Sequence, residues 1–206
     1  MGTRNLTCVY LDGQYKIAQY GQWDGYPEGQ GATCLKFLRE KMNLPLFKER
    51  LRAVSFIDKD KMHKIFTAFG GKENGIISME NHDKLYQVFP EFHRDTGAEI
   101  LEIVQNNELL TPYVLNSLDF AADSLWCEWC YVIDFDKNTF EVYCGFNIEP
   151  LTENDRFFFL ADKEDLESKG SDGKQFHGVK LAKSYDLNNL PTEEEFFADF
   201  KGDEDE

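Results

Sequence analysis

The sequence predicts one α+β domain, in which hairpins from the two ends of the chain form an antiparallel sheet and the middle supplies a helical layer. Three observations lead to this fold class. Residues 5–20 alternate apolar and polar side chains around Asp12-Gly13. Apolar residues recur at helical spacing over residues 46–110, and β-rich segments return after residue 125.

The first hairpin is expected to pair residues 5–11 with residues 14–20, because Asp-Gly readily adopts the positive φ angles of a tight turn. A glycine-rich loop, QYGQWDGYPEGQG, overlaps its end at residues 19–31. A helix is expected next, over residues 32–42, where apolar side chains recur at helical spacing before Pro45 ends the element.

The middle of the chain is predicted to be helical because its apolar residues recur with the period of an amphipathic helix. Asp58 and Asp60 are candidate caps for one of these helices, and Thr111-Pro112 is typical of a helix start. The expected helices span residues 46–57, 60–69, 79–89, 95–107 and 113–125.

The pattern changes to that of strands in the last third of the chain. A second hairpin is expected around the turn residues 136–138, and residues 162–175 are expected to form a polar loop. Thr192 and Glu195 have the spacing of a capping box for a short last helix. The expected strands span residues 126–135, 139–146, 156–161 and 177–187.

The chain of 206 residues is strongly acidic, with a formal net charge of −16 at pH 7. Such a surface repels nucleic acid and anionic membranes, so we expect a protein partner with a basic surface and no direct nucleic-acid binding. The alternative is that the acidic residues only supply solubility. We expect the domain to span residues 1–200 and the acidic tail, residues 201–206, to be disordered.

The sequence gives no reason to expect export or membrane insertion. Residues 1–13 lack the apolar segment of a secretory signal, and no apolar run is long enough to cross a membrane. The five cysteines are an odd number, which favours reduced thiols over a disulfide framework. We therefore expect a cytoplasmic protein, and the oligomeric state stays open.

The loop at residues 19–31 is the first candidate site, because it places two aromatic and two acidic residues between glycines. The acidic residues would repel a phosphate, and the loop lacks the lysine of a phosphate-binding loop. Functional residues often concentrate on such loops, but the loop also has a purely structural interpretation. In that interpretation glycine sets the turn geometry, Trp23 and Tyr26 pack down, and Asp24 caps a turn.

No motif of the sequence identifies a metal centre, a cofactor or a set of catalytic residues. Cys127-Glu128-Trp129-Cys130 resembles half of a zinc site without a second pair, and its spacing on a strand would point the thiols to opposite faces. Residues 134–141 begin like a calcium loop but lack its glycine and its last glutamate. We therefore interpret these cysteines as buried free thiols and residues 134–141 as a hairpin, and expect no metal or cofactor.

Residues 3–7, TRNLT, followed by the glycine-rich loop, resemble an uncharacterised family that is common in bacteriophages and prophages. The resemblance covers about the first forty residues. It implies an accessory role for a mobile element in the host cytoplasm, such as acting on a host protein or countering a defence system. The matching residues are Thr3, Arg4, Trp23, Asp24, Gly25, Tyr26, Pro27, Gly29 and Gly31.

A weaker resemblance, in the order of elements, is to N-terminal-nucleophile amidohydrolases. Those enzymes use a Cys, Ser or Thr at the start of the chain, whose free α-amine serves as the base. Removal of Met would expose Gly2, which has no nucleophile, and Thr3 would require further trimming. The resemblance therefore implies a lost activity or a coincidence.

Two functional hypotheses remain. In the first, the loop and Arg4 form a recognition surface, where Trp23 and Tyr26 are apolar anchors and Asp24 and Glu28 pair with basic residues of the partner. The glycines Gly25, Gly29 and Gly31, together with Pro27, would shape the loop. In the second, Arg4, Asp24 and Tyr26 serve an amide-bond hydrolase or another small-molecule enzyme.

Overall fold

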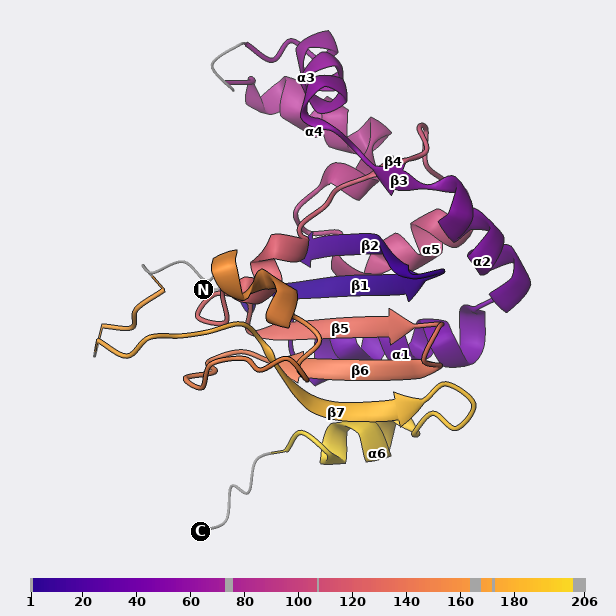
Figure 1. Ribbon diagram of the computed structural model, residues 1–206. Helices are drawn as coiled ribbons and strands as arrows, with labels where there is room; N and C mark the ends of the chain where they lie inside the picture. Colours follow the sequence, from indigo (N-terminus) through magenta and orange to yellow (C-terminus); the bar gives the residue numbers. More distant parts are fainter. Residues whose placement is uncertain (1, 73–75, 107, 164–167, 172, 202–206) are drawn as a thin grey trace.

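The computed structural model describes residues 2–72, 76–106, 108–163, 168–171 and 173–201. Its centre is a five-stranded sheet with the order β2-β1-β5-β6-β7, which joins strands from the two ends of the chain (Figure 1). The predicted α+β fold class is therefore confirmed. The strands are β1 (Asn5–Leu11), β2 (Gln14–Gly21), β5 (Trp129–Asp134), β6 (Thr139–Cys144) and β7 (Lys180–Asp186).

The sheet is antiparallel except at its centre, where β1 and β5 run parallel. Both predicted hairpins are confirmed. The first turns at Asp12 and Gly13, with φ angles of 53° and 77°, and the second contains Asn138 at φ 59°. The prediction of a fully antiparallel sheet was wrong for the pair β1 and β5. The helical middle of the chain connects β2 to β5 and crosses over, so that β5 runs in the same direction as β1.

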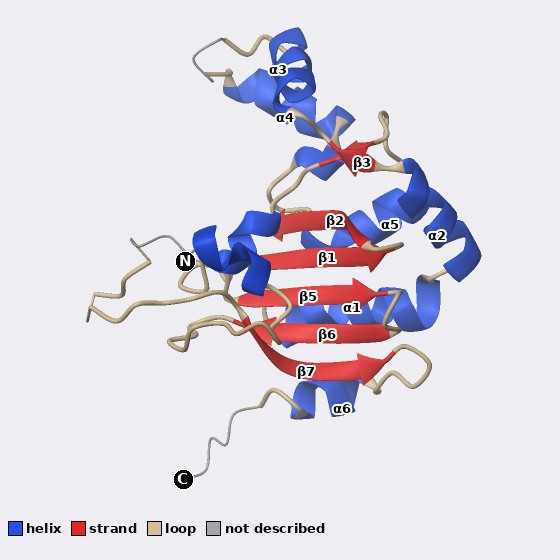
Figure 2. Ribbon diagram, in the orientation of Figure 1, coloured by secondary structure: helices blue, strands red, loops and turns tan. Residues whose placement is uncertain are grey.

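Most of the helices cover one face of the sheet (Figure 2). The predicted helix at residues 32–42 is confirmed as part of a longer helical run, in which two π-helical turns, Pro27–Gly31 and Phe37–Lys41, flank a short α-helix. The capping box of Thr192 and Glu195 is present. The α-helices of this layer are α1 (Ala32–Lys36), α2 (Leu44–Ala53), α5 (Ile100–Gln105) and α6 (Glu193–Ala198).

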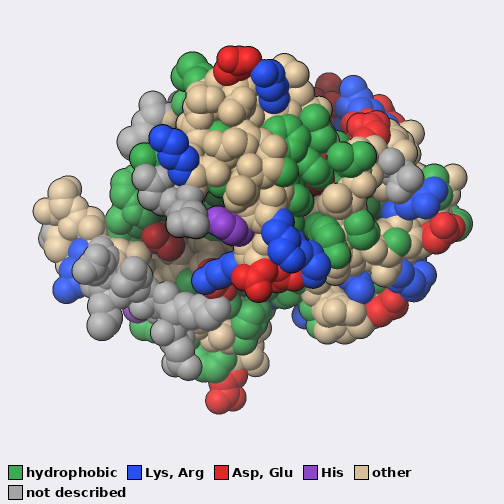
Figure 3. Space-filling model, turned by 90° about the horizontal axis from the view of Figure 1, so that it is seen from above, with side chains coloured by type: hydrophobic (Ala, Val, Ile, Leu, Met, Phe, Trp, Pro, Cys, Tyr) green, Lys and Arg blue, Asp and Glu red, His purple; other side chains and the backbone are tan. Residues whose placement is uncertain are grey.

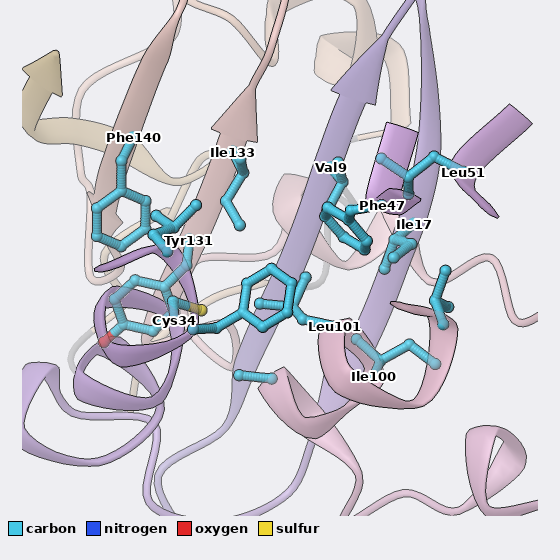
Figure 4. Close-up of a cluster of buried hydrophobic side chains, with 14 of the residues drawn as sticks. Val9, Ile17, Cys34, Phe47, Leu51, Ile100, Leu101, Tyr131, Ile133 and Phe140 are labelled. Carbon is cyan, nitrogen blue, oxygen red and sulfur yellow. The ribbon is translucent and has the colours of Figure 1, made fainter. Parts of the chain in front are cut away.

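The main core lies between the sheet and this helical layer (Figure 4). Side chains such as Val9, Ile133 and Phe140 point from the strands toward Phe47 and Leu101 of the helices, and all five are fully buried. Burying one such side chain contributes about 1.5–3 kcal/mol, so this layer is a principal source of stability.

A second apolar cluster covers the opposite face of the sheet, where 3-10 helices and loops replace the α-helices. The 3-10 helices span Leu118–Ala122 and Phe158–Lys163. Cys127 and Cys130 lie in this same cluster, so the expectation that they occupy opposite faces was wrong. Cys127 precedes β5 and does not follow the alternation of the strand.

The helices α3 (Lys59–Ala68) and α4 (Met79–Val88) stand away from the sheet (Figure 1). The side chain of Asp58 accepts a hydrogen bond from Lys61 N–H and caps α3, while Ser78 caps α4. A small apolar cluster of their own holds these helices together. They are joined to the domain by the parallel strands β3 (Ser55–Phe56) and β4 (Tyr113–Val114).

Two element predictions were wrong, and the helix expected over residues 46–57 ends early, at Ala53, before strand β3. Residues 113–125 form β4 and a 3-10 helix, because β4 pairs with β3 and the Asn116 side chain accepts from Leu118 N–H in a turn. Residues 156–161 form turns and a 3-10 helix, because Arg156 reaches into the protein to pair with carboxylates of the sheet. Residues 202–206 of the predicted acidic tail lie outside the described residues.

None of the helices in the described ranges combines the length and the apolar character that a membrane crossing requires.

Candidate functional site

The glycine-rich loop carries two exposed aromatic side chains on a backbone that is held at several points. Trp23 is 45% exposed and Tyr26 is 54% exposed. The Gly25 N–H donates to the Thr3 carbonyl at 3.0 Å, and the buried Tyr131 hydroxyl donates to the Gly25 carbonyl at 2.7 Å. The loop is therefore anchored to the strands, while its large side chains face solvent.

Close packing explains why the loop contains glycine at three positions. A Cβ atom at Gly25 would lie 2.7 Å from the Thr3 carbonyl oxygen, and one at Gly31 would lie 2.9 Å from the Tyr131 ring. At Gly29 it would lie only 2.1 Å from the Asp24 carbonyl oxygen. Residues 27–31 of the expected loop form a π-helical turn, and the buried Pro27 occupies its first position, where proline is favoured.

Asp24 has a φ angle of 55°, a conformation that Asp and Asn adopt more readily than most residues. Its side chain is exposed and makes no hydrogen bond or ion pair with the described residues. The structural interpretation of the loop had Asp24 cap a turn, and this part of the interpretation is therefore wrong.

Beside the loop, Asp24 and Glu28 line a hollow of about 430 Å³ together with Glu99 and Glu193. No ion pair within the described ranges engages any of these four carboxylates. Lys36 is the cation among the lining residues. We call Trp23, Tyr26 and these four acidic residues the loop surface, and its excess of unpaired negative charge suits a basic group.

Charge is distributed differently elsewhere on the molecule. In the view from above, Lys and Arg side chains lie beside Asp and Glu side chains, with hydrophobic side chains between them (Figure 3). The net negative charge is therefore not spread as one uniform field over that face.

The structure does not bring Arg4 into the hollow. Its guanidinium stacks on the ring of Trp126, with Cζ 4.2 Å from the ring centroid, and its backbone N–H donates to the Glu128 carboxylate at 3.2 Å. Neither Arg4 nor Tyr26 lines the hollow that contains Asp24. The three residues named for an enzyme site therefore do not share this cavity.

A larger cavity, of about 580 Å³, lies near the tips of the two hairpins and was not predicted from the sequence. Its size is within the range of small-molecule sites. We call it the hairpin cavity. Its lining combines aromatic and charged side chains: Tyr10, Gly13, Gln14, Tyr15, Phe56, Leu118, Asp134, Lys137, Arg156 and Phe159.

A buried group of charges lies at the hairpin cavity. Arg156 Nε donates to Glu141 Oε2 at 2.7 Å, and Nη2 donates to Glu141 Oε1 at 3.1 Å and also to the Asp134 carboxylate. The Arg156 side chain is only 8% exposed, and the two carboxylate side chains are 1% and 7% exposed. Charge-assisted, bidentate contacts of this kind are among the strong hydrogen bonds of proteins.

The surroundings of Arg156 and of two neighbouring tyrosines shift the pKa values of these three groups. Burial opposes the charge of Arg156, but the hydrogen bonds to Glu141 and Asp134 prevail and raise the pKa of its guanidinium. Burial raises the pKa of Tyr15 and of Tyr143, so both phenols stay neutral. The guanidinium of Arg156 therefore stays charged and these two phenols stay neutral near pH 7.

Cys34, Cys127 and Cys130 are fully buried thiols. Burial raises the pKa of Cys34 to about 12 and raises the pKa of Cys127 and Cys130 well above the ordinary value. These thiols are free and protonated. Among the described residues, no group of three His, Cys, Asp or Glu side chains is arranged to hold a metal ion.

In comparisons with protein-family models, with curated proteins and with solved structures, nothing matches the chain. The two sites are therefore interpreted from their own chemistry.

Proposed function

We propose that this protein is a binding protein that recognises a basic segment of another protein through the loop surface. The observation that carries the proposal is the exposure of Trp23 and Tyr26 on an anchored loop, beside a hollow lined by four unpaired carboxylates. Exposed aromatic residues are frequent anchors of interfaces, and carboxylates set specificity by pairing with Lys or Arg.

The anchored backbone supports this function because little conformational freedom would be lost on binding. Gln30 N–H donates to the Asp24 carbonyl at 2.8 Å, and the Asn5 amide donates to the Trp23 carbonyl at 3.2 Å. These contacts hold the loop before a partner arrives. The net charge of −16 would add long-range attraction for a basic partner.

The biological setting of the proposal rests on the resemblance of Thr3, Arg4 and the loop to the phage family. In this setting the protein is an accessory protein of a phage or mobile element. It acts in the host cytoplasm, where it binds a host or defence protein.

The proposal is tested by capturing proteins from a host lysate with the wild type and with a Trp23→Ala/Tyr26→Ala variant. A matched control variant, Phe146→Ala/Ile148→Ala, removes two hydrophobic side chains that are 57% and 56% exposed elsewhere. We expect a captured protein with a basic surface to be lost by the loop variant and kept by the control. Equal capture by all three proteins would refute the proposal.

The charge requirement is tested separately with the captured partner. Glu28→Gln/Glu99→Gln removes two carboxylates of the hollow, and Glu80→Gln/Asp83→Asn removes two exposed carboxylates of α4. We expect the first variant to weaken binding by about tenfold and to reduce its salt dependence, and the second to change neither. An equal effect of both variants would indicate general attraction by net charge instead of recognition at the loop surface.

A further inference from the structure

We propose that the hairpin cavity binds a small, uncharged compound with a planar aromatic ring. The inference rests on three features of the cavity: aromatic walls, hairpin tips that are tied together, and buried charges that are already paired with one another. It is independent of the proposed protein partner, because none of the residues that line the hairpin cavity belongs to the loop surface.

The walls of the cavity contain aromatic rings that pack against one another and present surface to a ligand. Tyr10 and Tyr15 meet edge to face with centroids 5.0 Å apart, and Tyr15 and Phe159 are tilted with centroids 6.3 Å apart. Phe56 and Leu118 add apolar surface. Phe159 is 57% exposed, so a flat ligand against it would remove apolar area from water.

The shape of the cavity is fixed because the two hairpin tips are tied together. The Asp136 carboxylate accepts hydrogen bonds from Asp12 N–H at 3.0 Å and from Gly13 N–H at 2.7 Å. Arg52 of α2 donates to the Asp12 carboxylate at 2.7 Å. The tip that carries Tyr10 and Tyr15 is thereby held against the tip that carries Lys137, so a ligand would meet a preformed site.

The charges around the cavity favour an uncharged ligand. Every carboxylate oxygen of Asp134 and Glu141 accepts at least one hydrogen bond within the described residues. With Arg156 they leave one net negative charge, which the exposed ammonium group of Lys137 at the same cavity offsets. A charged ligand would lose its hydration without gaining an unpaired counter-charge in the interior. The ammonium group of Lys137 is exposed to water, so it would offer an anionic ligand only a weak surface ion pair.

The experiment compares three probes that share a bicyclic ring and differ in charge: 2-naphthamide, 2-naphthoate and 2-naphthamidine. Binding to the full chain is measured by ligand-observed saturation-transfer NMR with titration. We expect 2-naphthamide to bind with a dissociation constant below about 1 mM, and each charged probe to bind at least about fivefold more weakly.

Two neighbouring phenylalanines provide a matched pair of variants. Phe159 lines the cavity, whereas Phe158 is 39% exposed and does not line it. We expect Phe159→Ala to weaken binding of 2-naphthamide by about tenfold and Phe158→Ala to leave it unchanged. Gln14→Trp, which places a ring at the cavity from an exposed position, should abolish binding while the thermal unfolding midpoint stays the same.

Three outcomes would overturn the proposal. Absence of saturation transfer from the wild type to 2-naphthamide would mean that the cavity is not a site for aromatic ligands. Equal or tighter binding of either charged probe would refute the charge argument. Equal effects of Phe159→Ala and Phe158→Ala would place the bound probe outside the cavity.

Discussion

The loop surface and the hairpin cavity use the same kinds of residue in opposite ways. Both combine aromatic rings with carboxylates, but the carboxylates of the loop surface are exposed and unpaired, whereas Asp134 and Glu141 at the cavity are buried and paired with Arg156. In the first region negative charge is available to a partner. In the second region the negative charge is paired with Arg156 inside the fold, so the aromatic rings are the surface that a ligand can contact.

The comparison teaches that pairing and burial decide what an acidic residue does. An exposed carboxylate contributes little to stability and much to electrostatic recognition. A buried, paired carboxylate contributes little to recognition, but breaking its pair leaves an uncompensated charge in the interior. The two regions should therefore respond to substitution in opposite ways, and the predictions below test this difference.

The largest effect is expected for Arg156→Met, which leaves Asp134 and Glu141 buried without their cation. We expect a loss of about 3–5 kcal/mol in the free energy of unfolding, because two carboxylates would remain desolvated and close together. Urea denaturation at pH 7 measures it. The control is Arg52→Met, which breaks an ion pair whose side chains are 53% and 48% exposed and should cost less than about 1 kcal/mol.

Similar losses for the two arginine variants would show that the buried charges are not distinct from surface ion pairs, and the contrast between the regions would then fail.

Glu91 represents a third arrangement, a carboxylate that is buried but unpaired. It is 0% exposed, and neither carboxylate oxygen has a hydrogen-bond partner among the residues that the structure describes. Burial raises the pKa of Glu91 from 4.5 to about 7. The protonated form therefore stabilises the fold below pH 4.5, and this contribution is lost as the pH rises through 7.

We expect Glu91→Gln to be nearly neutral at pH 4 and to stabilise the protein at pH 8 by an amount on the order of 3 kcal/mol. Chemical denaturation at a series of pH values measures the difference between the variant and the wild type. A difference that does not change with pH would mean that Glu91 keeps its ordinary pKa.

Sequence patterns predicted the elements that depend on local signals. The Asp12-Gly13 turn, the capping box at Thr192 and the α+β fold class follow from short-range patterns of turn residues, caps and periodicity. Residues 113–125 were mispredicted because β4 is stabilised by pairing with the distant β3. Such pairing overrides helical periodicity and has no local signature.

The same distinction explains which site could be predicted. The loop at residues 19–31 is contiguous, so its aromatic and acidic residues are visible together in the sequence. The hairpin cavity joins Tyr10 and Tyr15 to Arg156 and Phe159, which only the folded sheet brings together. The local signal for the cavity was Asp134, a polar residue at the end of an apolar strand. In the sequence, residues 134–141 were compared with a calcium loop and interpreted as a hairpin.

A smaller effect is expected for Gly29→Ala in the loop. A Cβ atom there would lie 2.1 Å from the Asp24 carbonyl oxygen, so the backbone must move. We expect a loss of about 1–3 kcal/mol, measured by urea denaturation. The control is Gly13→Asn, at a turn with φ 77° and open space around it, where Asn is tolerated. Equal effects would mean that the loop adapts and is not anchored as described.

The smallest effect on stability is expected at Asp24, where backbone and charge can be separated. Asn tolerates the φ angle of 55°, so Asp24→Asn should change the free energy of unfolding by less than about 0.5 kcal/mol. Asp24→Ala should cost about 1 kcal/mol, because Ala fits this conformation poorly. If the charge serves recognition, both variants bind the captured partner more weakly than the wild type does. If Asp24 only builds the loop, Asp24→Asn binds the partner as the wild type does, and stability alone separates the two variants.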